Sequence, residues 1–395
     1  MSNREVIDYL KKSPVFASSL GSKELFHSNI WAYLIEQDAR YLKVFFKDFV
    51  VENYSNSKKE VYREKLNMDL IIRIGSDVFV IENKIKSLPR EDQLRDYEGK
   101  MDNDKNKEFY VPKEKRHFCL TGIPEDGPKF LKKPNSLQES WEYVNYKKIS
   151  DQLKEITMGI ILNEETKHFR FFALEYAEMI NNLSDLLSAK EHELKDVFYF
   201  PQHYENDDYK DIREELRIDD ILQKINADQF TTYAHEQLDK NNLGVQSKTG
   251  YTNQRSLSEF YYLIGNEKDE EGKPSEHLKF GVQIQNTMFR WFAEVYKPKI
   301  TKDIVFEKGK EIGWFSEKNK KGWITTPIKQ LGEKETSMTK SSCMYQPMFV
   351  YQCFTIKEGD CSIGDLANTV VCFMKKAKET VDEYAKKLGV NPEKR

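Results

Sequence analysis

The alternation of apolar and polar positions divides the first half of the chain into short helical and strand-like runs. Leu25, Ile30 and Leu34 recur at helical spacing and predict an amphipathic helix. The helices expected from such patterns cover residues 23–38, 41–51, a stretch opened by Pro89, 141–153 and 166–187. The strands expected from branched and aromatic runs cover residues 66–74, 77–85 and 117–122, with a polar loop over 52–60. This order of elements predicts a compact α/β core.

A polar stretch over residues 190–207, with few apolar repeats, separates this core from the rest of the chain. Beyond it, helices are expected over residues 211–243 and 362–388, and strands over residues 260–264, 278–285, 289–296 and 346–355. A chain of 395 residues is too long for one hydrophobic core of ordinary size. We therefore expect two domains, an N-terminal α/β domain over residues 1–189 and a C-terminal α+β domain over residues 190–395.

Composition and charge narrow the class of protein. With 39% hydrophobic and 13% aromatic residues, the chain has the composition of a folded protein. No apolar run approaches the roughly 20 residues of a spanning helix, which predicts a soluble, cytoplasmic protein without membrane contact. The net charge of −3 means that any site for a polyanion must be local. The five cysteines contain no CxxC pair and predict buried thiols rather than disulfides or a zinc site.

Candidate chemistry is concentrated in the expected hairpin. A two-residue loop at Gly75 and Ser76 places Asp69 directly opposite Glu82, and period-two alternation places Lys84 on the same face. If the loop is shifted by one residue, Asp69 opposes Lys84 and the three still share a face. The neighbouring strand residues are apolar on both faces, so uncompensated charge there costs several kcal/mol. The pattern therefore predicts a bound divalent cation or a tight charge network.

The arrangement of Asp69 followed by Glu82-Asn83-Lys84 on the next strand resembles the PD-(D/E)XK nuclease superfamily, over roughly residues 20–155. The resemblance implies a restriction-endonuclease-like αβββαβ core. It also implies that Asp69 and Glu82 hold Mg²⁺ or Mn²⁺, and that Lys84 orients the attacking water and stabilises the pentavalent phosphate. Asn83, the middle residue of the motif, is expected to do no chemistry.

Flanking residues extend the resemblance. Glu24, on the first long helix, resembles the family's early acidic position, which implies a catalytic, metal-binding or water-binding role; the alternative is an acid that complements the helix dipole. His27 shares its face and is expected to be a packing or hydrogen-bonding residue. Gln93 and Tyr97 resemble the Gln-xxx-Tyr pattern of the RecB-like branch, which implies a catalytic role for Gln93 and a nucleic-acid contact for Tyr97. The alternative is that Gln93 and Tyr97 belong to a partly exposed polar face of their helix and have no functional role.

A lysine-rich segment, residues 297–321, holds eight lysines against four acidic residues, with Trp314 and Phe315 interleaved. Lysines with aromatic residues suit a nucleic-acid groove, whereas a solvated hairpin with core tryptophans is the alternative. The candidate nucleic-acid-binding residues are Lys318, Lys320 and Lys321. No cluster of His, Cys or carboxylates in this half reaches the strength of a metal site, and no Gly-rich phosphate loop is present.

These features and the resemblance predict a Mg²⁺- or Mn²⁺-dependent nuclease that acts on DNA as an endonuclease. The resemblance alone implies a role in restriction or anti-phage defence. The C-terminal domain is expected to recognise substrate, form a homo-oligomer, or sense a trigger or regulatory partner. The rival hypothesis is a catalytically inactive protein of the same fold that binds nucleic acid or a protein partner. The intact Asp, Glu and Lys favour catalysis over this rival.

Overall fold

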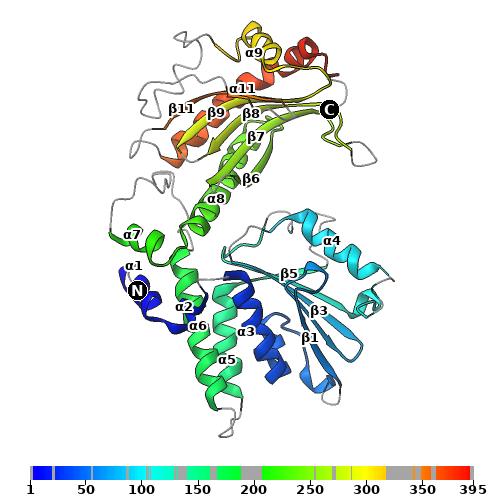
Figure 1. The fold of residues 1–395 in the computed structure, drawn as a ribbon, viewed down its shortest axis with the longest axis vertical. Coiled ribbons are helices and arrows are strands. Elements are labelled where there is room, and N and C mark those ends of the chain that lie inside the picture. Colours follow the sequence, from blue (N-terminus) through cyan, green and yellow to red (C-terminus); the bar gives the residue numbers. More distant parts are fainter. Residues whose placement is uncertain are drawn as a thin grey trace. The chain divides into compact units, whose positions relative to one another are not determined.

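The computed structural model contains two compact units (Figure 1). It describes residues 3–19, 23–54, 57–85, 89–103, 106, 108–128, 131, 140–160, 167–187, 207–252, 255–268, 273–285, 287–316, 341–342, 348–356 and 362–391. The first unit comprises residues 1–189 and 206–225, and the second comprises residues 190–205 and 226–395. The short second segment of the first unit therefore lies beyond the boundary expected from the sequence.

The first unit is built on a mixed sheet of five strands in sequential order. Its strands are β1 (Lys59–Arg63), β2 (Leu70–Ile74), β3 (Asp77–Lys84), β4 (Arg116–Gly122) and β5 (Trp141–Asn145). Strands β1 to β3 are antiparallel, whereas β3, β4 and β5 are parallel. Helix α3 (Lys23–Gln37) precedes the sheet and α4 (Glu91–Asp102) connects β3 to β4. This αβββαβ order confirms the predicted fold class.

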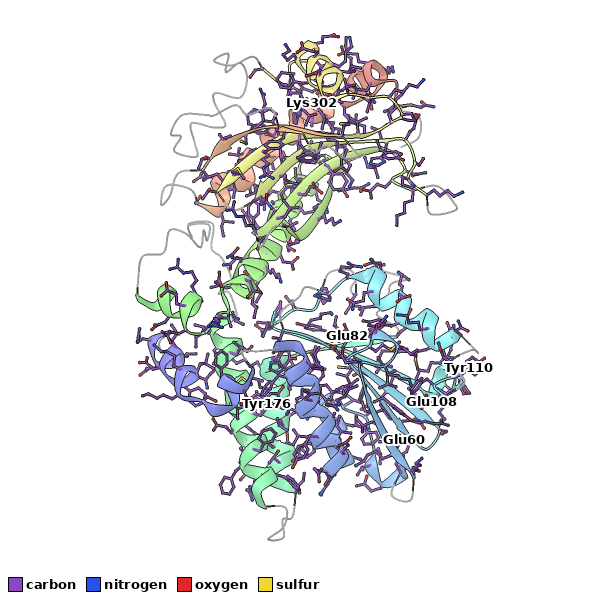
Figure 2. All side chains as sticks on the ribbon, in the orientation of Figure 1. Glu60, Glu82, Glu108, Tyr110, Tyr176 and Lys302 are labelled. Atoms are coloured by element: carbon purple, nitrogen blue, oxygen red, sulfur yellow. The ribbon has the colours of Figure 1, made fainter. Side chains whose placement is uncertain are left out.

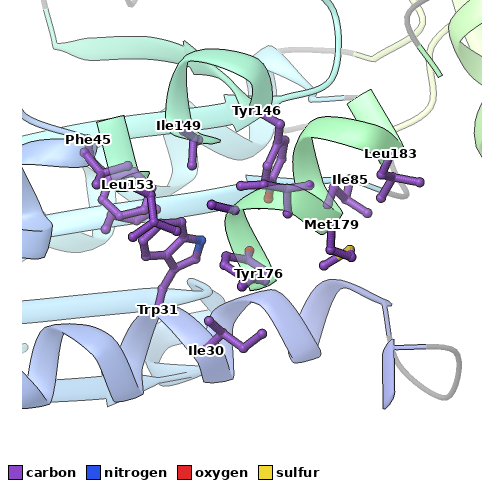
Figure 3. Packing of buried hydrophobic residues seen from close by; sticks show 14 of the residues in the cluster. Ile30, Trp31, Phe45, Ile85, Tyr146, Ile149, Leu153, Tyr176, Met179 and Leu183 are labelled. Atoms are coloured by element: carbon purple, nitrogen blue, oxygen red, sulfur yellow. The ribbon is translucent and has the colours of Figure 1, made fainter. Parts of the chain in front are cut away.

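Helices cover both faces of this sheet. One face carries Leu70, Ile72 and Ile81 and packs against a large apolar cluster that includes Trp31 and Tyr176 (Figure 3). The helices that contribute to this cluster are α1 (Asn3–Lys12), α2 (Pro14–Ser19), α3, α5 (Tyr146–Gly159), α6 (Lys167–Leu187), α7 (Asp207–Glu214) and the first turns of α8 (Asp219–Lys240). On the other face, Ile71, Val78 and Val80 pack against α4 through Leu94, Tyr97 and Met101. Strands buried on both faces are typical of the centre of an α/β domain.

The β2–β3 hairpin has the predicted register. Ile71 pairs with Val80 and Ile74 pairs with Asp77, which leaves Gly75 and Ser76 as the two-residue loop. Gly75 has a φ of +59°, a conformation that glycine adopts without a steric penalty. The register is therefore fixed by local turn chemistry together with the burial of both strand faces.

Several local predictions for this unit are wrong. The strand expected over residues 66–74 begins only at Leu70, because residues 65–67 form a 3₁₀ segment. The loop expected over residues 52–60 ends too late, because Lys59 and Glu60 already belong to strand β1, a charged and half-buried edge strand with little apolar signal. Residues 141–145 form β5 instead of a helix, because they pair with β4. The expected helix over 41–51 is replaced by two 3₁₀ segments, η1 (Ala39–Val44) and η2 (Val51–Tyr54).

The second unit is an antiparallel sheet in the order β10-β11-β9-β8-β7-β6. Its strands are β6 (Gln246–Thr252), β7 (Arg255–Gly265), β8 (His277–Gln285), β9 (Met288–Tyr296), β10 (Ser341–Ser342) and β11 (Met348–Thr355). The helices that the structure describes from residue 219 onward are α8 (Asp219–Lys240), α9 (Lys302–Glu311) and α11 (Ile363–Leu388). The Ser362 side chain accepts the Asp365 N–H and caps α11, and Gly389 ends the helix in a left-handed conformation, which agrees with the helix expected over residues 362–388. The predicted α+β class is thus confirmed, and strands β6 and β10 and helix α9 are elements that the sequence did not predict.

Two further expectations concern the cysteines and membrane-spanning helices. Cys119 and Cys353 are buried, but Cys372 is exposed, so the prediction of buried thiols fails for that residue. Among the residues that the structure describes, no helix combines the length and the apolar character needed to cross a bilayer.

Candidate active site

Asp69 and Glu82 lie side by side where β2 begins and β3 ends. Because Leu70 pairs with Ile81, Asp69 extends the ladder opposite Glu82. The Asn83 backbone N–H donates to Oδ2 of Asp69 at 2.6 Å, and the Asp69 backbone N–H donates to Oε2 of Glu82 at 3.4 Å. Glu82, labelled in Figure 2, is only 2% exposed, whereas Asp69 is half-buried. The main chain therefore fixes both carboxylates at the rim of a buried sheet.

Lys84 completes the charged group. Its Nζ lies 2.6 Å from Oε1 of Glu82, and its side chain is 9% exposed. One ammonium neutralises one of the two carboxylate charges, so the group of Asp69, Glu82 and Lys84 carries a surplus negative charge. A surplus charge at a nearly buried position is costly unless a cation offsets it. The chemistry of the donor set therefore fits a divalent ion bound by carboxylate oxygens.

Helix α4 holds Glu82 in position. Nε2 of Gln93 donates to Oε1 of Glu82 at 2.9 Å and lies 2.6 Å from the hydroxyl of Tyr97. That hydroxyl donates to the carbonyl of Asn67 at 2.6 Å. Burial, together with the nearby Glu82 and Asp69 charges, raises the pKa of Tyr97, so the phenol stays protonated and able to donate. Gln93 and Tyr97 thus reach the same place, as their spacing on one helix face predicts.

The chain turns sharply just before Asp69. Glu64, Leu66 and Asn67 all have positive φ angles, 55°, 56° and 63° respectively. Each such residue costs about 1–2 kcal/mol, unless contacts compensate. The Lys100 ammonium donates to the Leu66 carbonyl at 3.1 Å, beside the Tyr97 bond to the next carbonyl. This short 3₁₀ segment, η3 (Lys65–Asn67), is therefore clamped by α4 and sets where Asp69 begins β2.

Lys100 is a site residue that the sequence reasoning missed. Its position three residues after Tyr97, on the same face of α4, is the signal that could have found it. The strained turn has a weaker signal, since only Asn67 is a residue type that favours the left-handed region.

Asn83, expected to do no chemistry, connects the site to the opposite face of the sheet. Its buried side chain donates to Oγ of Ser28 at 3.1 Å, and its Oδ1 accepts from Oγ1 of Thr121 at 3.2 Å. Oδ1 also lies 3.4 Å from the hydroxyl of Tyr146. These contacts tie the end of β3 to α3, β4 and α5, while the Asn83 backbone orients Asp69. The middle residue of the motif therefore positions the residues around it.

Helix α3 supplies the remaining candidates near the motif. Glu24 belongs to this helix, but its side chain lies outside the described residues; Ser28, which contacts Asn83, follows it by four positions. His27 is 1% exposed, and its Nδ1 lies 2.7 Å from the Tyr176 hydroxyl. Burial lowers the pKa of His27 to about 3, so the ring is neutral. His27 is thus a packing and hydrogen-bonding residue, as expected.

This buried histidine should make the first unit acid-sensitive. The unfolded chain binds a proton at His27 below its ordinary pKa of about 6.5, whereas the folded chain does not until about 3, so stability falls as the pH drops through that interval. Replacing His27 with Gln should remove about 2 kcal/mol of the loss between pH 7 and pH 5. Hydrogen exchange of peptides from α3, followed between pH 7 and pH 5, would measure this change in stability. His235→Gln, at a half-buried position, is the control, and an unchanged pH dependence in His27→Gln would contradict the prediction.

The lysine-rich segment is only partly described. Lys318, Lys320 and Lys321 lie outside the described residues. Trp314 and Phe315 are buried in the core of the second unit, where Trp314 packs 4.3 Å from the ring of Phe280. These two aromatic residues therefore stabilise the fold and cannot stack on bases, which agrees with the core alternative for them. Residues 302–311 form α9, so the hairpin alternative is wrong there.

Comparison with known proteins agrees with the geometry of the hairpin. No curated protein and no solved structure matches the chain. The family model of the PD-(D/E)XK nuclease superfamily matches residues 15–178, a range that runs from α2 to α6 and contains Asp69, Glu82 and Lys84. Nucleases of this superfamily hydrolyse phosphodiester bonds and generally use divalent metals. The N-terminal part of this chain, residues 15–178, is therefore similar to the PD-(D/E)XK nuclease superfamily.

Proposed function

We propose that the protein is a metal-dependent nuclease that cuts DNA as an endonuclease. The observation that carries this proposal is the pairing of Asp69 with Glu82 across the hairpin, with the Lys84 ammonium 2.6 Å from Glu82. A decayed member of the fold has no need to keep two carboxylates and a lysine at a nearly buried sheet end, because the charges are costly there. Their retention favours catalysis.

The metal would be held by Asp69 and Glu82, with Glu24 as a further ligand. Carboxylate oxygens suit Mg²⁺ or Mn²⁺, which are the ions we propose. When bound, such an ion supplies Lewis-acid polarisation of the phosphate and a lower pKa for its bound water. Ser28, four residues after Glu24 on α3, reaches Asn83, which supports a place for Glu24 near this end of β3.

The side chains of the protein perform the remaining tasks. Asp69 is oriented by the Asn83 N–H, and Glu82 is oriented by Gln93. Lys84 places a positive charge where negative charge develops on the phosphate during attack, and would orient the attacking water. Tyr97 would contact the nucleic acid beside Gln93. Because these groups sit on strands and a helix, their geometry is preorganised before substrate binds.

The second half of the chain is proposed to direct this activity. We assign the nuclease domain to residues 1–189 and a recognition, oligomerisation or sensing domain to residues 190–395. Contacts of Lys318, Lys320 and Lys321 with the DNA backbone would suit such a role. A nuclease with a separate domain of this kind is suited to restriction or anti-phage defence in the cytoplasm, where cutting must be restrained until a target or partner is engaged.

Incubation with nucleic acids tests the proposal directly. Supercoiled plasmid, linear DNA and RNA would be incubated with purified protein and Mg²⁺, Mn²⁺ or EDTA. We expect nicking and linearisation of the plasmid with either metal and none with EDTA. Cleavage of RNA alone would reassign the substrate, and cleavage in EDTA would contradict the metal dependence. Tight DNA binding without cleavage in any arm would favour the inactive binding protein.

A further inference from the structure

The second unit brings together three metal-ligating side chains from three separate segments. Glu267 follows β7, His277 begins β8 and Glu294 lies in β9; their ligand atoms all lie within 4.8 Å of one another. The sequence predicted no cluster of metal-site strength in the C-terminal half. The three residues are far apart in sequence and meet only through the pairing of β8 with β7 and β9. The cluster shares no residue with the site at Asp69.

His277 is oriented as a ligand. Its Nδ1 lies 2.8 Å from the carbonyl of Ser275, and since a carbonyl only accepts, Nδ1 carries the hydrogen. In the neutral ring, the lone pair is then on Nε2. Within the part of the chain that the structure describes, Nε2 is buried and has no hydrogen-bond partner. The ring is 4% exposed and stacks on Tyr296 at an interplanar angle of 10°, which fixes its plane.

That nitrogen lies near a carboxylate. Nε2 of His277 lies 3.9 Å from Oε1 of Glu294. Two acceptors face each other at this distance, an unfavourable arrangement unless a cation lies between them. Metal-bound histidines share this arrangement: one ring nitrogen donates to a carbonyl, which fixes the tautomer, and the other nitrogen keeps its lone pair for the metal.

The charge around His277 also favours a cation. Lys279 forms ion pairs with Glu267 and Glu294, with 3.3 Å to the latter. Its charge also interacts with Glu259, a buried acid on β7. The single Lys279 ammonium therefore balances only part of the negative charge of these carboxylates, and it provides no hydrogen bond to Nε2 of His277. A divalent ion would engage both carboxylates and the imidazole at once.

We propose that Glu267, His277 and Glu294 form a second metal site, which takes a divalent transition-metal ion of the Zn²⁺ type. An imidazole nitrogen with two carboxylates suits Zn²⁺ better than Mg²⁺ or Ca²⁺, which prefer oxygen ligands alone. The ion would join the end of β7 to β8 and β9 and so stabilise the second unit. Lys279 competes with it, because the ammonium lies between the same two carboxylates.

Calorimetric titration with Zn²⁺ tests this site in the full-length chain. The Asp69→Asn background weakens metal binding at the nuclease site, so binding that persists in it reports on the second unit. We expect His277→Gln in that background to weaken this binding by about tenfold or more. His235→Gln is the matched control, because His235 pairs with Asp239 at 3.5 Å and belongs to no three-residue cluster of possible metal ligands among the described residues. Unchanged Zn²⁺ binding in His277→Gln would overturn the proposal.

A second variant separates ligation from a structural role. Lys279→Met, in the same background, should tighten Zn²⁺ binding by about tenfold, since the competing ammonium is gone. Loss of a merely structural ion pair would weaken binding or leave it unchanged, and either result would overturn the site. Co²⁺ as a spectroscopic substitute should give an absorption band that Lys279→Met retains. The proposal is also refuted if the NMR chemical shifts of the His277 ring show an imidazolium and do not change when Zn²⁺ is added.

Discussion

Asp69→Asn should reduce metal-dependent DNA cleavage by about 10³-fold, because it removes a metal-binding charge worth several kcal/mol to the transition state. Asparagine has nearly the same shape, and its side-chain oxygen can still accept the Asn83 N–H that now bonds Oδ2 at 2.6 Å. The fold should therefore survive while the site loses one of its two carboxylate charges. Single-turnover cleavage of plasmid at a fixed Mg²⁺ or Mn²⁺ concentration measures the effect.

Asp77→Asn provides the matched control for this variant. Asp77 lies on the same hairpin at its turn end, is 4% exposed and pairs with His117 at 3.1 Å. Its replacement should cost stability but leave the cleavage rate within a few-fold of the wild type. If Asp69→Asn retains more than a tenth of the wild-type rate, or if both variants lose activity equally, Asp69 is not the metal-binding residue we propose.

Lys84→Met should lower the cleavage rate by about 10²–10³-fold while metal binding persists or tightens. The ammonium does not bind metal; it lies 2.6 Å from Glu82 and is proposed to stabilise charge that develops on the phosphate. Methionine keeps most of the apolar stem, so the packing of this nearly buried side chain is preserved. Comparison of the cleavage rate with Mn²⁺ affinity, measured by calorimetry, separates the two effects.

Arg90→Met is the control for a basic residue near the same strand. Arg90 precedes α4 and pairs with Asp92 at 2.7 Å, with a side chain that is 69% exposed. An exposed pair of this kind contributes little, so its loss should change the rate by less than a few-fold. Equal rates in Lys84→Met and the wild type would remove Lys84 from the mechanism, and a parallel loss of Mn²⁺ binding would show a metal-positioning role instead.

The sequence by itself determined the features that depend on neighbours close along the chain. The hairpin register follows from the glycine turn and from apolar residues on both faces, so the opposition of Asp69 and Glu82 follows from the order of residues alone. The limits of α11 follow from Ser362 and Gly389 in the same way, because a cap acts on the nearest backbone groups. The catalytic and metal-binding roles assigned to these residues stay predictions for the variants above to test.

Only the tertiary structure decided features whose partners are distant in sequence. Strands β1 and β5 are identified by their pairing with β2 and β4, not by an apolar pattern of their own. The clamp of Lys100 and Tyr97 on the turn before Asp69 joins residues that lie far apart along the chain. The cluster of Glu267, His277 and Glu294 needs three strand segments to be aligned. Local sequence carries the energetics of turns and caps, but which side chains meet across a sheet is fixed only when the whole core is packed.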